Sequence, residues 1–264
     1  MTGSVARSLI ASVFVAFCAS QLTAQQEPPP NPHAVQPERP TVATHAGTLA
    51  PGWFEIETGV ERDQFNPGTG IGTPTTLKLG IGSHQQLSIW GSVPQPDSSS
   101  FGVGDLFIGV KWRLLDDAKI IGDFAILPSI KLPTGSVSAG RGTGTTDGTL
   151  LLISSHDFSG VAMDINAGYT RRSGNGSQAP VNATLWTVSF GGPAVNQFGW
   201  VAETYGFPAT TGPAGQASIV AFLAGPTYQP KEWLAFDAGV IIPITGPQPH
   251  ALYAGGVWNV GKVW

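Results

Sequence analysis

The 264-residue sequence is poor in charged residues, has a single cysteine and contains no long hydrophobic run. Charged residues make up 11% of the chain, against about 25% in an average soluble domain, so a surface in water would lack its usual charge. The longest apolar run, Leu9–Ala19, is far shorter than the roughly 20 residues of a membrane-spanning helix. Disorder is excluded as well, because 41% of the residues are hydrophobic and the net charge is only −4.

The sequence also lacks the groups that several kinds of site require. Its only cysteine, Cys18, lies in the N-terminal apolar run, which excludes disulfides, a catalytic thiol and cysteine-bound metal from the rest of the chain. The five histidines show no spacing typical of metal ligands, and we expect neither a metal nor another cofactor. No basic stripe is present, so nucleic acid is not an expected partner.

The N-terminal segment has the three-part layout of a secretory signal. Arg7 precedes the apolar run, and small residues near Ala24 suit cleavage after that position. Residues 1–24 are therefore predicted to be an export signal, with a short buried helix as the alternative. The proline-rich residues 25–52 are expected to form an extended tail, which leaves 53–264 as the folded domain. The sequence leaves open whether this tail folds into the lumen as a plug.

From residue 53 onward, apolar and polar residues alternate with a period of two. Phe54 and Ile56, for example, alternate with Glu55 and Glu57. Such alternation predicts strands with one apolar and one polar face, and no segment has a convincing helical period. The predicted strands are residues 53–61, 74–82, 85–93, 103–114, 120–132, 147–157, 160–171, 181–191, 197–207, 216–227, 232–243 and 251–264.

The connections between these strands alternate strictly between short and long. Tight turns such as Ser83-His84 are followed by connections rich in Gly, Pro, Ser and Thr, such as Pro133–Thr146. This alternation is typical of outer-membrane barrels, which have short periplasmic turns and longer external loops. We therefore predict an all-β protein, an up-and-down antiparallel transmembrane β-barrel of about 12 strands in the bacterial outer membrane. A soluble periplasmic barrel is the alternative.

The polar face of the predicted strands carries charges of both signs, about one per strand. Mixed charges suit an enclosed lumen in which they pair, while lipid covers the apolar face. The predicted lumen-lining charges are Glu55, Glu57, Lys78, Asp105, Lys111, Arg113, Asp123, Lys131, Asp164, Glu203 and Asp237. Twelve strands fall between filled barrels of ~8 strands and open porins of ~16, so the predicted polar lumen allows only a narrow passage for a small solute.

The last predicted strand, residues 251–264, alternates up to an aromatic residue at Trp264. This ending resembles the assembly signal of bacterial outer-membrane barrels. The expected partners are thus outer-membrane lipid, a small-molecule solute of unknown identity, and the barrel-assembly machinery.

Residues Ser154–Asp157 read Ser-Ser-His-Asp, which are the residue types of a hydrolase site. Adjacent residues on a strand point to opposite faces, so these consecutive residues do not form a catalytic triad with one another. A polar strand end is the favoured interpretation, and no catalytic residue is predicted.

The stretch Leu127–Gly135, which reads Leu-Pro-Ser-Ile-Lys-Leu-Pro-Thr-Gly, is the most specific part of a family resemblance. Together with segments such as Pro51–Gly59 and Gly109–Leu115, it resembles the bacterial family named for a MetA pathway of phenol degradation. The resemblance covers about residues 39 to 264. It implies an exported outer-membrane barrel, of a kind usually called a transporter, that passes aromatic or other hydrophobic small molecules.

Three functions therefore remain open from the sequence. The leading prediction is a passive channel for a small solute, aromatic or hydrophobic according to the resemblance. The second is a non-conducting barrel with a structural or surface-binding role, and the least favoured is an outer-membrane hydrolase.

Overall fold

The computed structural model describes residues 31–65, 68–96 and 100–264. The predicted export signal, residues 1–24, and the first residues of the predicted tail lie outside the described residues. In the described ranges the strands are β1 (Trp53–Gln64), β2 (Thr69–Gly72), β3 (Pro74–Gly82), β4 (Gln85–Ser92), β5 (Leu106–Ala118), β6 (Gly122–Leu132), β7 (Asp147–Asp157), β8 (Ala162–Arg172), β9 (Asn182–Val195), β10 (Phe198–Phe207), β11 (Ile219–Lys231), β12 (Leu234–Thr245) and β13 (His250–Lys262). No helix in these ranges is long and apolar enough to cross a membrane.

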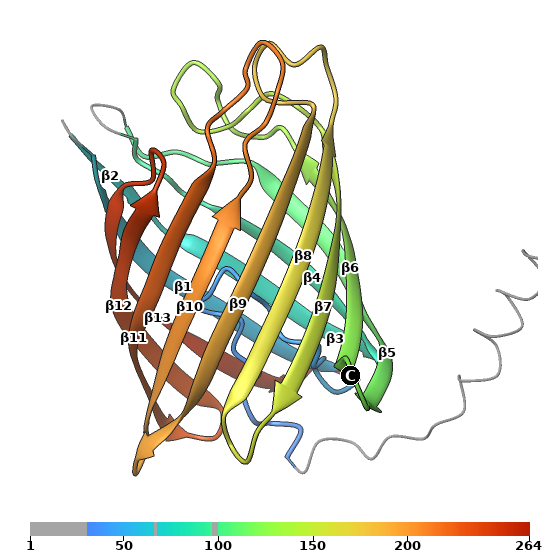
Figure 1. Cartoon of the computed structure of the whole chain (residues 1–264). Helices are drawn as coiled ribbons and strands as arrows, with labels where there is room; N and C mark the ends of the chain where they lie inside the picture. The colour runs from blue at the N-terminus through green and yellow to red at the C-terminus, as the bar shows by residue number, and fades with distance from the viewer. Residues whose placement is uncertain (1–30, 66–67, 97–99) are drawn as a thin grey trace, which may run out of the picture. The chain divides into compact units, whose positions relative to one another are not determined.

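The strands form a closed antiparallel barrel with twelve strand positions (Figure 1). Consecutive long strands pair with each other, and β1 closes the barrel by pairing with β13 along its whole length. The short strand β2 pairs with Glu61–Gln64 of β1, and β3 pairs with Phe54–Thr58 of the same strand. The strands β2 and β3 therefore share one of the twelve positions. This confirms the prediction of an up-and-down antiparallel barrel of about 12 strands.

Each predicted strand overlaps one observed strand, and the differences lie at the connections. The strands β9 and β11 end at Val195 and Lys231, beyond their predicted ends at residues 191 and 227. Strand pairing there includes residues whose composition is typical of a turn. The predicted long connection between residues 62 and 73 also contains the paired strand β2. Glycine and threonine dominate Thr69–Gly72, and glycine contributes little strand signal.

Apolar side chains face outward from the barrel. Val60, Phe236 and Trp258 are 49%, 45% and 47% exposed, whereas the charged side chains of Glu55 and Lys78 are fully buried. A soluble protein has the opposite arrangement, with its apolar side chains inside. The outer surface is therefore suited to lipid.

Residues 31–52, which we call the inner segment, run inside the barrel near the short turns (dark blue in Figure 1). The segment begins beside the β11–β12 turn, where the Val35 amide donates to the Glu232 carbonyl oxygen at 2.8 Å. It ends against β3, where the Gly52 amide donates to the carbonyl oxygen of Gly80 at 2.8 Å. Gly80 permits this close approach, because a side chain there would collide with the backbone of Ala50.

Candidate functional site

A buried cluster of charges joins the inner segment to β1 and β3. Lys78 Nζ lies 2.6 Å from Glu55 Oε1 and 2.5 Å from Glu57 Oε1. The second oxygen of Glu55 accepts a hydrogen bond from the Gln36 amide, and Glu57 accepts one from the Glu38 amide, both at 2.9 Å. Two acidic residues on the inner face of β1 thus hold both a lysine of β3 and the backbone of the inner segment.

A second lysine extends this cluster across the lumen. Lys111 on β5 forms an ion pair with Glu38 and donates a hydrogen bond to the His45 carbonyl oxygen at 2.8 Å. Burial alone would raise the pKa of Glu38, but the ammonium groups of Lys111 and Lys78 lower it well below its usual range. The inner segment therefore contributes its own charged carboxylate to the cluster.

Two polar side chains on the opposite wall bind the backbone of the inner segment. Glu203 on β10 accepts hydrogen bonds from the amides of Val42 and Ala43, at 2.8 and 2.7 Å. Asn166 on β8 accepts one from the Thr44 amide at 2.8 Å and donates one to the Thr44 carbonyl oxygen at 2.9 Å. Backbone groups that would otherwise be unpaired inside the barrel are satisfied in this way.

Arg39 is fixed by the shape of the wall as well as by charge. Its guanidinium group forms two hydrogen bonds to Asp237 on β12 and lies over Gly59 and Gly255, which face each other in the β1–β13 ladder. A Cβ atom added to either glycine would be 2.5 Å from Nη2 of Arg39. The two glycines therefore provide the space that the guanidinium occupies.

A separate ion network lies at the opposite end of the barrel, beside the long loops. Lys131 Nζ lies 3.2 Å from Asp105 and 2.9 Å from Asp147, and Arg172 Nε lies 3.2 Å from Asp147. Asp105 also accepts hydrogen bonds, at 3.0 Å each, from the amides of two residues in the β6–β7 loop, Gly135 and Thr143. The network thus ties that loop to the barrel wall.

Burial alone would raise the pKa of Asp105. The amides of Thr143 and Gly135, together with Lys131, nevertheless lower the pKa below its usual value. Asp105 is therefore a charged anchor for the loop at neutral pH.

The remaining predicted residues lie toward the short-turn end. Arg113 Nε is 3.0 Å from Asp116, and its Nη1 is 4.0 Å from Asp123. Asp164 accepts a hydrogen bond from Ser155 Oγ at 2.5 Å. The structure thus divides the predicted charges into a group in contact with the inner segment, a group at the long-loop rim and a group at the short-turn end.

Two cavities remain between the inner segment and the long-loop end. The inner chamber, of about 420 Å³, has residues 38–44 of the inner segment along one side and side chains from several strands around it. The outer vestibule, of about 680 Å³, lies beside β2 and the β4–β5 connection, where Phe65 and Ile71 line it. Both cavities are lined by Glu61 and Pro74, so they adjoin at these residues.

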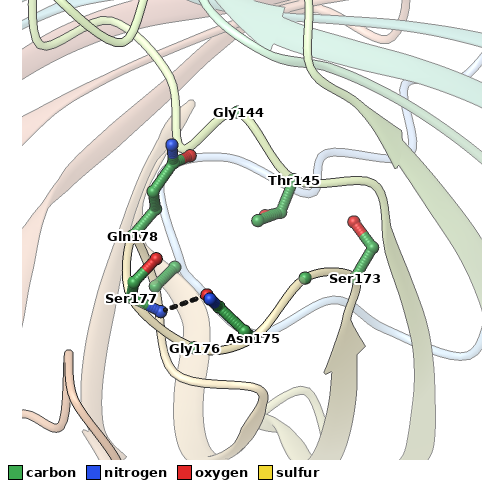
Figure 2. Close-up of a pocket in the computed structure, with 9 residues that line it drawn as sticks. Gly144, Thr145, Ser173, Asn175, Gly176, Ser177 and Gln178 are labelled. Carbon is green, nitrogen blue, oxygen red and sulfur yellow. Dashed lines mark hydrogen bonds between the residues drawn. The ribbon is translucent and has the colours of Figure 1, made fainter.

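A third cavity lies among the long loops, as Figure 2 shows, and has a volume of about 560 Å³. Thr145 and residues 173–179 line it with hydroxyl and amide groups. The Ser177 amide donates a hydrogen bond to Asn175 Oδ1 at 3.1 Å. This loop pocket is neutral and polar, unlike the two cavities in the lumen.

Sequence reasoning missed the apolar part of the inner wall. The prediction described a polar lumen, but Tyr205, Leu223, Ile241 and Tyr253 form a buried cluster on the inner face of β10–β13. It also missed Arg39 and other polar residues of the inner segment, whose proline-rich sequence carries no periodic signal.

The side chains of Ser154, His156 and Asp157 are divided between the two faces of β7. Ser154 Oγ lies 3.3 Å from His156 Nε2, while the Asp157 carboxylate accepts a hydrogen bond from the Gly160 amide at 2.9 Å. Asp157 therefore does not orient His156 as the acidic member of a triad would. Within the described ranges, no group of three or more His, Cys, Asp or Glu side chains could hold a metal ion.

The closed barrel, with apolar residues outside and buried charges inside, defines the class of the protein, a bacterial outer-membrane barrel with a channel- or porin-like fold. It is similar to an outer membrane channel from Pseudomonas putida F1, with a TM-score of 0.64 and 12% identity over 85% of this chain and 99% of that chain. The NanC porin gives a TM-score of 0.53 at 10% identity, over 78% of this chain and 98% of its own. The KdgM porin in complex with disordered oligogalacturonate gives 0.52 at 10% identity, with the same two coverages.

The family follows from the sequence. The family model described as "Putative MetA-pathway of phenol degradation" matches residues 38–256, and the chain belongs to this family. The resemblance carried by Leu127–Gly135 and its companion segments is thereby confirmed. No curated protein matches the sequence. The fold confirms the predicted outer-membrane location, with lipid around the apolar belt, short turns toward the periplasm and long loops toward the exterior.

Proposed function

We propose that this protein is a passive channel for small solutes of aromatic or hydrophobic character. The observation that carries the proposal is that the outer vestibule and the inner chamber adjoin at Glu61 and Pro74. Together the two cavities provide space from the external loops to the inner segment. Trp90, Leu127 and Leu151 are among the side chains around the chamber, which suits a ligand with an apolar body.

We further propose that the inner segment narrows the periplasmic half of the path. Its hydrogen bonds to Glu203, Asn166 and the Glu55–Glu57 pair hold it against the inner wall. In this proposal two of the three groups of predicted charges have separate roles. Those near the middle of the barrel position the segment, and those of the Asp105–Lys131 rim shape the external entrance.

Liposome swelling tests the channel proposal directly. Refolded protein is reconstituted into vesicles and challenged with small neutral solutes, such as benzyl alcohol and glycerol. A channel gives swelling rates above those of empty vesicles, and benzyl alcohol should enter faster than a sugar too large for the chamber. A folded barrel that leaves every solute at the empty-vesicle rate would overturn the proposal.

A non-conducting barrel is the second candidate, and a specific observation favours it. The inner segment is bound by buried ion pairs and backbone hydrogen bonds, which would close the periplasmic half if the segment never moved. The loop pocket in Figure 2 would then offer a neutral polar surface for binding. Protein that binds an external glycan yet conducts no ions would support this candidate.

The ends of the chain support proposals about export and assembly. We infer that residues 1–24 direct export, and that the barrel-assembly machinery recognises residues 251–264, in which Leu252, Trp258 and Trp264 are exposed. Deleting Trp264 should slow insertion into the outer membrane of cells while leaving refolding in detergent unchanged. We also infer a role without catalysis, which absence of esterase activity in the purified barrel would support.

A further inference from the structure

The chamber and the vestibule adjoin at two carboxyl groups of β1, those of Glu61 and Asp63. Glu61 and Asp63 lie on the inner face of β1, two residues apart, so their carboxyl groups are neighbours. Within the part of the chain that the structure describes, neither takes part in an ion pair. Glu61 lines both cavities and Asp63 lines the vestibule, so a solute that moves between the cavities passes them.

Most of the other charges along the lumen are paired with an opposite charge; Asp164, which accepts a hydrogen bond from Ser155, is an exception. Lys78 is paired with Glu55 and Glu57, Lys111 with Glu38, Arg39 with Asp237, and Lys131 and Arg172 with rim aspartates. Glu203 has no cationic partner among the described residues, but it accepts two backbone amide hydrogen bonds. The carboxyl pair of β1 therefore adds negative charge to the outer half of the lumen, and the cation that acts on Glu61, Arg39, is itself paired with Asp237.

The surroundings of the pair are aromatic and apolar. Tyr253 lines the chamber and is 5% exposed, and its hydroxyl group has no hydrogen-bond partner in the described residues. Trp90, which also lines the chamber, stacks on Phe107 with ring centroids 5.3 Å apart. The vestibule adds Phe65. Aromatic faces attract cations.

We propose that the chamber selects small amphiphilic organic cations, in which an ammonium group is attached to an aromatic or aliphatic body. This inference rests on the proposed channel function and names the substrate class of the same path. The ammonium group binds Glu61 and Asp63, while the body of the solute contacts Trp90, Leu127 and Leu151. The chamber volume of about 420 Å³ lies within the roughly 300–1,000 Å³ of small-molecule sites.

Reversal potentials of the full-length barrel in planar bilayers test the selectivity. The probes are benzylammonium chloride and sodium benzoate, which have bodies of similar size and opposite charge. We expect benzylammonium to be about tenfold more permeant, the ratio that ~1.4 kcal/mol of differential interaction produces. The Glu61→Gln and Asp63→Asn variants should each bring this ratio toward one.

The matched control is Asp117→Asn, which removes one carboxylate at the exposed short-turn end. Asp117 has a φ of 48°, a conformation that asparagine tolerates well. This variant should keep the preference of the unmodified protein. Heat-modifiable gel mobility shows whether each variant has folded.

A second measurement uses the unmodified protein alone and does not depend on the folding of any variant. Benzylammonium added on the external side should reduce the potassium current at concentrations at which benzyl alcohol does not. A barrel that conducts potassium and passes neutral solutes but treats benzylammonium and benzoate alike would overturn this inference and leave the channel proposal standing. A barrel that passes nothing would overturn both. An unchanged preference in folded Glu61→Gln and Asp63→Asn would also overturn the inference.

Discussion

Arg39 on the inner segment and Asp237 on β12 are joined by two hydrogen bonds, 3.2 Å from Nε and 3.1 Å from Nη2. The two side chains are only 11% and 4% exposed. Removing one member of a buried ion pair leaves the other charge without compensation. The pair therefore holds the middle of the inner segment against β12.

Replacing Arg39 with glutamine should loosen the inner segment. We expect a loss of about 3 kcal/mol in the free energy of unfolding, the lower end for a broken buried pair, together with a larger single-channel conductance. Urea titration in lipid vesicles and bilayer recording measure the two effects. The double variant Arg39→Gln with Asp237→Asn should regain part of the stability, because the uncompensated carboxylate is gone. Unchanged stability and conductance in Arg39→Gln would contradict the prediction.

A side chain at Gly255 should displace Arg39 without altering any charge. The Cβ of Gly255→Val would lie 2.5 Å from Arg39 Nη2 and 2.6 Å from the Thr58 carbonyl oxygen, so the substitution displaces the guanidinium group and also strains the β1–β13 pairing. Its effect on conductance should be at least that of Arg39→Gln, and adding Arg39→Gln to it should change the conductance little further. Gly148→Ala on β7 is the control, since a Cβ there meets no atom within 4 Å. Additive effects of Gly255→Val and Arg39→Gln would show that the glycine acts on something other than Arg39.

The outward-facing Leu152 tests the lipid contact. It lies in the middle of β7 and is 41% exposed. Leu152→Lys should cost roughly 2–4 kcal/mol of folding free energy in vesicles, as charges near the bilayer midplane do. Thr211→Lys in the external β10–β11 loop should cost almost nothing. Equal costs at the two positions would argue that Leu152 does not face the hydrocarbon.

Acidification should release the β6–β7 loop from the rim. The pKa of Asp105 is lowered in the folded barrel, so its contribution to holding the loop is complete above its ordinary value near 4. The contribution is lost as the pH falls through the lowered folded value. Hydrogen exchange of the Gly135 and Thr143 amides should therefore accelerate, relative to other loop amides, only in strong acid.

At neutral pH, Asp105→Asn should mimic this release. Trypsin should then cut after Arg141, in the same loop, several-fold faster than in the unmodified barrel. Cleavage at an unchanged rate would show that other contacts hold the loop.

The strands were predictable because their environment imposes a period of two. One face of each strand meets lipid and the other meets the lumen, so apolar and polar residues alternate, as in Phe54–Glu57. The same alternation assigns the charges to the strand face opposite the apolar one. The apolar cluster around Tyr253 was not predictable. On β10–β13 apolar residues occupy inner-facing as well as outer-facing positions, so the alternation of apolar and polar residues is lost there.

The inner segment could not be placed from the sequence. Its backbone is bound by isolated side chains such as Glu203 and Asn166, which lie more than 120 positions away along the chain. No local pattern encodes contacts of that kind. The sequence therefore predicted an extended tail before the barrel and left open whether this tail folds into the lumen.

Both ends of the inner segment lie at the periplasmic mouth. Asn31 bonds to Glu232 beside the β11–β12 turn, and the Gly52 carbonyl oxygen accepts a hydrogen bond from the Val263 amide at 2.7 Å. The segment enters and leaves by the same opening, so no part of it is threaded through the closed wall. The barrel can consequently close first and receive the segment from the periplasm afterwards, and the segment can withdraw by that route without any strand separating from its neighbour.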